Sequence, residues 1–126
     1  MGIAVACAAL GLFYAIAGAW MLFSPQTFYE IAAFGPYNRH FIGDTGAVFL
    51  ALGIALLRAT PRPYPSRYVI DAALFASVIH LGNHLAEGFS QSLDWQTDLG
   101  LGAVLAVNLY ASIWSRRGAR LTRDLK

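Results

Sequence analysis

Long apolar runs alternate along this chain with short polar connections. A helix that crosses a bilayer needs about 20 mostly apolar residues, and four of the runs reach that length. We predict spans at residues 3–23, 40–59, 68–89 and 95–114. Proline and glycine occur in the connections, and the first connection predicts a short helix in the membrane interface at residues 26–34. The pattern predicts an all-α fold, a bundle of four transmembrane helices forming one domain over residues 1–126.

The composition agrees with a chain surrounded by lipid. Hydrophobic residues make up 57% of the sequence and charged residues only 13%. Soluble domains carry about 25% charged residues, so this chain lacks the polar surface that a water-exposed globule needs. The net charge is only +2, and the basic residues do not form the continuous face that a nucleic acid would require. We therefore expect the lipid bilayer, and not a nucleic acid, as the principal partner.

The distribution of basic residues predicts the topology. Apart from Arg39, they fall in two groups, one around the second connection (Arg58, Arg62, Arg67) and one after the fourth span (Arg116, Arg117, Arg120, Arg123, Lys126). Four spans place both groups on the same side of the membrane. Because basic connections favour the cytoplasmic side, we expect both termini in the cytoplasm and a multi-pass protein of a bacterial inner membrane.

Each span carries a row of small residues at i, i+4 spacing, which is typical of helix contacts in membranes. The expected rows are Gly11, Ala15 and Ala19; Gly43, Ala47, Ala51 and Ala55; Ala72 and Ala76; and Gly102 and Ala106. In the third span the row continues into His80 and His84, and in the fourth it follows Asp98. We therefore expect these polar side chains to face the interior of the bundle, at the level of the outer leaflet of the membrane.

Two histidines and a carboxylate share one face of the third span. His80, His84 and Glu87 are the predicted metal ligands, and their nitrogen and oxygen atoms suit zinc, copper or iron. A haem would need His40 together with one of them, because His80 and His84 lie on the same helix face. The same pocket could instead hold a small lipid-like or quinone-like ligand. Its predicted ligand-binding residues are Arg39, His40, Asp44, Asn83 and Asp98.

Other interpretations of the polar residues stay open. They could form a structural hydrogen-bond network in an accessory subunit of a larger membrane complex, or in a homo-oligomer, and they could also carry protons or a substrate. An enzyme is not favoured, because no catalytic triad order, phosphate-binding loop or HExxH motif occurs. A hydrolase with His84 as base is a weaker alternative. Asp71 is expected to pair with Arg67, one helical turn before it.

Two motifs carry a resemblance to a known group. The segment NRHFIGDTGAVFLALG at residues 38–53 and the segment HLGNH at residues 80–84 resemble small four-span bacterial membrane proteins, and the general layout is similar to that of the DoxX-like group. The resemblance implies a four-helix bundle with a polar site between its second and third helices. It implies no particular activity.

Overall fold

All regular elements in the part of the chain that the structure describes are helices. The computed structural model describes residues 2–32, 36–90 and 95–124, with the side chains of residues 87–90 and 119–124 excepted. The helices are α1 (Ile3–Phe23), α2 (Pro25–Ala32), α3 (Arg39–Ala59), α4 (Arg67–Ser90) and α5 (Trp95–Asp124). Within these ranges α1, α3, α4 and α5 are long and apolar enough to cross a membrane. This confirms the predicted all-α fold, and it is the architecture of a small polytopic membrane protein.

The helix ends follow local sequence signals. The side chain of Asn38 accepts a hydrogen bond from the amide of Phe41 at 3.0 Å and so caps the start of α3. Pro25 opens α2, where its missing N–H leaves no helical bond unmade. The last helix continues past the predicted end at residue 114 to Asp124, because the basic segment after the apolar run contains no proline.

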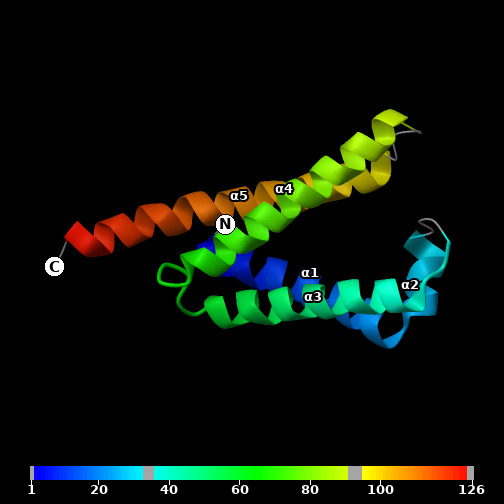
Figure 1. Cartoon of the computed structure of the whole chain (residues 1–126). Helices are drawn as coiled ribbons and strands as arrows, with labels where there is room; N and C mark the ends of the chain where they lie inside the picture. The colour runs from blue at the N-terminus through cyan, green and yellow to red at the C-terminus, as the bar shows by residue number, and fades with distance from the viewer. Residues whose placement is uncertain (1, 33–35, 91–94, 125–126) are drawn as a thin grey trace.

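The helices pack as two pairs. Figure 1 shows α1 lying along α3 and α4 lying along α5, and these are the most extensive helix contacts. The pairs meet where α1 contacts α5 and α3 contacts α4. They lie close together near residues 60–66 and diverge toward α2 (Figure 1). We call the end with α2 and the start of α3 the α2 end, and the end with residues 60–66 and the last turns of α5 the basic end.

Glycines let α1 and α3 approach until their backbones touch. A Cβ added to Gly53 would lie 2.7 Å from the Cα of Ala15, and a Cβ added to Gly18 would lie 2.7 Å from the carbonyl oxygen of Gly46. Gly11 and Gly18 in α1 are seven residues apart, as are Gly46 and Gly53 in α3. Seven residues are close to two helical turns, so each pair recurs on one face. The α1–α3 pair is therefore held by close van der Waals packing of backbone on backbone.

The contact faces are not the predicted small-residue rows. Gly11 is buried as expected, but Ala51 of α3, Ala76 of α4 and Ala106 of α5 are exposed. The buried small and polar residues are instead Gly46 and Gly53 in α3, Ala73 and Ser77 in α4, and Asn108, Ala111 and Ser112 in α5. The predicted rows in these three helices were wrong because a second row of small or polar residues lies one position away in α4, two positions away in α5 and one or two positions away in α3. One position turns the face by about 100°, and two positions turn it by about 200°.

Hydrogen bonds join α4 to α5 and to α1. The Nδ2 of Asn108 donates to the hydroxyl oxygen of Ser77 at 2.9 Å, and the hydroxyl of Tyr14 lies 2.7 Å from the same oxygen. One to two turns nearer the basic end, the hydroxyl of Ser112 donates to Asp71 at 2.6 Å. These hydrogen bonds connect α1, α4 and α5 through side chains in the interior of the bundle.

The carboxylate of Asp71 pairs across the helices and not along its own helix. Its Oδ2 lies 3.0 Å from a guanidinium nitrogen of Arg116 in α5. Arg67, the predicted partner, donates instead to the hydroxyl of Tyr68 at 2.7 Å. The predicted i, i+4 ion pair was therefore wrong. Asp71 is only 15% exposed and faces α5, where Arg116 and Ser112 are within its reach.

Replacing Tyr14 with phenylalanine should weaken this network slightly. The substitution removes one hydroxyl and keeps the ring, which packs edge-on against Phe49 at a centroid distance of 5.4 Å. Ser77 keeps its bond to Asn108. Interhelical hydrogen bonds in membranes contribute about 0.6 kcal/mol on average and up to about 1.7 kcal/mol. Unfolding of the variant in detergent micelles should show a loss within that range, and a stability unchanged from the parent would show that the bond contributes nothing.

Candidate functional site

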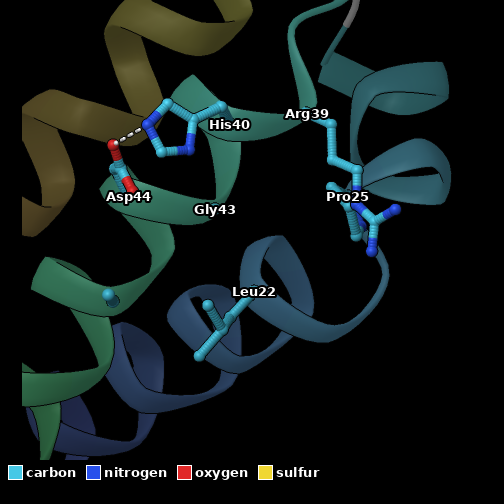
Figure 2. Close-up of a pocket in the computed structure, with 7 residues that line it drawn as sticks. Leu22, Pro25, Arg39, His40, Gly43 and Asp44 are labelled. Carbon is cyan, nitrogen blue, oxygen red and sulfur yellow. Dashed lines mark ion pairs between the residues drawn. The ribbon is translucent and has the colours of Figure 1, made fainter.

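A groove opens at the α2 end between the last turn of α1, the start of α2 and the first turns of α3. Its volume is about 440 Å³, and Figure 2 shows the side chains around it. The sequence explains why the space is open: Pro25 starts a new helix directly after α1, and nothing lies within 4 Å of the position that a Cβ on Gly43 would occupy. The lining residues are Leu22, Pro25, Arg39, His40, Gly43, Asp44 and Ala47.

The charged side chains of the groove lie on its α3 side. The Nε2 of His40 is 3.4 Å from the Oδ2 of Asp44, one helical turn along α3, and both side chains are largely exposed. Figure 2 shows His40 turned toward Asp44, whereas Arg39 extends the other way toward Pro25. Arg39 can only donate hydrogen bonds, an ionised Asp44 can only accept them, and His40 can do either. The rim thus offers both kinds of partner to a polar group.

A second polar cluster lies between α4 and α5, also toward the α2 end. The rings of His80 and His84 are 5.0 Å apart between centroids, and the Nδ1 of His84 lies 3.9 Å from the Oδ1 of Asp98. Asp98 is in the first turn of α5, where the helix dipole stabilises a negative charge. On its other side His80 meets the ring of Phe49 in α3, at a centroid distance of 6.1 Å.

The structure places the predicted site residues in two groups. Arg39, His40 and Asp44 line the groove, and His80, His84 and Asp98 lie along the α4–α5 pair. None of the second group lines the groove. Asn83 is exposed on α4, and the side chain of Glu87 lies outside the described residues.

The predicted metal site is not complete among the described side chains. Over that part of the chain, no group of three or more His, Cys, Asp or Glu residues is arranged to hold a metal ion. Two imidazoles from His80 and His84 are adjacent, but their predicted partner Glu87 is not among the described side chains. A metal on His80, His84 and Glu87, and a haem, therefore stay predictions.

The sequence interpretation missed the polar residues deepest in the bundle. Asn108 and Ser77 are buried, and Asn108 Oδ1 has no hydrogen-bond partner among the residues described. Tyr14 lies in the middle of α1, away from the span ends where interfacial aromatic residues belong. The sequence signal that could have identified them is the presence of a polar side chain, Asn108 or Tyr14, in the middle of an apolar run.

The buried polar residues and the polar residues of the groove therefore differ in what surrounds them. The buried polar residues connect helices to one another, whereas Arg39, His40 and Asp44 line the groove that a ligand could enter. No family model, no curated protein and no solved structure matches the chain.

Proposed function

We propose that this membrane protein binds a small lipid-like or quinone-like amphiphile in the groove at the α2 end. The observation that carries the proposal is the composition of the groove. Arg39, His40 and Asp44 provide hydrogen-bonding groups, and apolar side chains provide the rest of the lining (Figure 2). Its volume of about 440 Å³ falls within the range of about 300–1,000 Å³ that is typical of small-molecule sites.

The order of residues along α3 suits a molecule with a polar head and an apolar tail. Arg39 is the first residue of α3, and Ala47 is two turns further, about 12 Å along the axis at 1.5 Å per residue. A head group at Arg39 would therefore lie at the end of the span, while its tail would reach Ala47 within the apolar part. A carbonyl oxygen would accept from Arg39, and a hydroxyl would donate to Asp44.

The proposal can be tested with a benzoquinone that carries one isoprenoid unit, because quinones quench tryptophan fluorescence. Trp20 reports on the α2 end, where its indole donates to Thr27 at 2.8 Å. In a protein reduced to this tryptophan by Trp95→Phe and Trp114→Phe, we expect quenching that saturates. Arg39→Gln should raise the apparent Kd about tenfold or more, since a hydrogen bond to a charged group contributes about 1.5–3 kcal/mol.

Two controls separate binding from partition into the micelle. A protein that keeps only Trp114, at the basic end, should show weak quenching that rises linearly with quinone. Gly43→Leu should fill the groove and abolish the saturable phase, because the position has open space around it. Linear quenching of equal strength at both tryptophans would exclude the proposed site.

The two other functions predicted from the sequence, an accessory subunit and a metal-binding protein, would give different experimental results. An accessory subunit should co-purify in mild detergent with partner proteins in fixed proportion. A metal held by the α4 histidines should appear in elemental analysis of the purified protein and disappear in His84→Ala. Either result with no saturable quinone binding would replace the groove as the functional site.

A further inference from the structure

Arginines from four segments gather at the basic end. Arg58 lies in the last turn of α3, Arg62 in the connection that follows, Arg67 at the first position of α4, and Arg116 and Arg117 near the end of the apolar part of α5. The connection is packed onto α5, because a Cβ on Gly118 would collide with the ring of Tyr64. Pro63, the neighbour of Tyr64 in the connection, is buried. The basic residues of the connection and of α5 thus belong to one surface.

Two of these guanidinium groups lie over aromatic rings. The Cζ of Arg67 is 4.7 Å from the centroid of the Tyr68 ring, and the Cζ of Arg117 is 5.0 Å from the Trp114 ring. Tyr68 is 70% exposed and Trp114 is 46% exposed, so both rings lie on the outside of the bundle. Tyrosine and tryptophan at span ends sit at the level of lipid head groups. The stacked guanidiniums are therefore held at that level, on the side that lipid surrounds.

The positive charge of this surface is not neutralised within the described residues. Asp71 is the acidic residue with a described side chain near this end, and it pairs with Arg116. No carboxylate in the described part lies within 4.0 Å of Arg58, Arg62 or Arg67, and the same holds for Arg117. Among the described residues, Arg58, Arg62, Arg67 and Arg117 therefore have no paired carboxylate and offer donors to an external anion.

We propose that the Arg67–Tyr68 and Arg117–Trp114 pairs, together with Arg62 of the connection, bind the phosphate groups of anionic phospholipids. A guanidinium matches phosphate with two parallel hydrogen bonds, and stacking on a ring fixes its plane before the lipid arrives. Basic residues next to a membrane span attract anionic head groups. This site is at the opposite end from the groove and does not depend on it.

The test uses the full chain in nanodiscs that contain phosphatidylcholine and phosphatidylglycerol, with retained lipids counted by native mass spectrometry. We expect the parent protein to keep phosphatidylglycerol in preference to phosphatidylcholine. Arg67→Gln with Arg117→Gln should lower this preference by roughly ten- to thirtyfold, as expected for two surface arginines. Both side chains are on the surface, and unchanged helix content and elution in phosphatidylcholine would verify that the variant folds.

A charge-preserving variant separates a formed site from diffuse attraction. Arg67→Lys with Arg117→Lys keeps both charges but loses the planar donors, so we expect it to retain only part of the preference. Inorganic phosphate added to the protein in detergent should not reproduce the thermal stabilisation that phosphatidylglycerol gives. A glutamine variant that keeps the full preference, a lysine variant equal to the parent, or equal stabilisation by free phosphate would each overturn the proposal.

Discussion

Gly53→Ala should force α1 and α3 apart and lower the free energy of unfolding by about 1–3 kcal/mol, the usual cost of adding atoms to a filled interior. A Cβ at this position would lie 2.7 Å from the Cα of Ala15 and 2.8 Å from the carbonyl oxygen of Gly11. Both are backbone atoms, so no side-chain rotation can relieve the contact and a whole helix must move. Thermal or denaturant unfolding in detergent micelles measures the effect.

The control for this prediction is the same substitution in open space. Nothing lies within 4 Å of a Cβ on Gly82 in α4. Gly82→Ala should therefore leave stability unchanged or raise it by up to about 1 kcal/mol, since alanine loses less backbone entropy in a helix. Combining Gly53→Ala with Gly18→Ala should cost less than the two separate losses together, because the helices have already moved apart. Equal effects of Gly53→Ala and Gly82→Ala would refute the backbone contact.

Arg116→Ala should destabilise the α4–α5 pair by about 3 kcal/mol, the lower end of the range for removing one partner of a buried ion pair. Asp71 would stay in place at 15% exposure, with Ser112 as the hydrogen-bond partner left to its carboxylate among the described residues. The lower end applies because Arg116 is 52% exposed and the pair is partly solvated. Asp71→Ala should cost less, about 1–2 kcal/mol, because the guanidinium left behind can reach water or head groups.

The neighbouring arginine provides the matched control. Arg117 lies over Trp114 with no carboxylate within 4.0 Å in the described part, so Arg117→Ala should cost no more than about 1 kcal/mol. Replacing Asp71 and Arg116 together by leucine should recover most of the stability that Arg116→Ala loses, because no charge is then left unpaired. If both arginine variants unfold alike, the pair with Asp71 has no special role.

The span positions could be predicted because they depend on local properties. Apolar run length, prolines and the Asn38 cap act within a few residues, and the predicted span at residues 3–23 coincides with α1. The extension of α5 was missed because the span was predicted from hydrophobicity, which falls after Trp114. The helix itself continues to Asp124 through a segment that contains no proline.

The candidate site could be predicted only as a list of residues. The i, i+4 spacing placed His40 beside Asp44 and His80 beside His84, and the structure shows both neighbours. Sequence spacing does not say how α3 and α4 are oriented relative to each other. The expected single pocket appears as a groove at the start of α3 and a cluster between α4 and α5.

By itself, the sequence determined how many long apolar helices form, where they begin, and which end carries the arginines, because each of these follows from neighbours along the chain. Only the tertiary structure decided which face of each helix is buried and which polar groups meet. Tyr14 and Ser77 are 63 positions apart, and their contact depends on how closely whole helices approach. That approach is set by backbone contacts such as Gly18 on Gly46, which no periodicity within a single helix reveals.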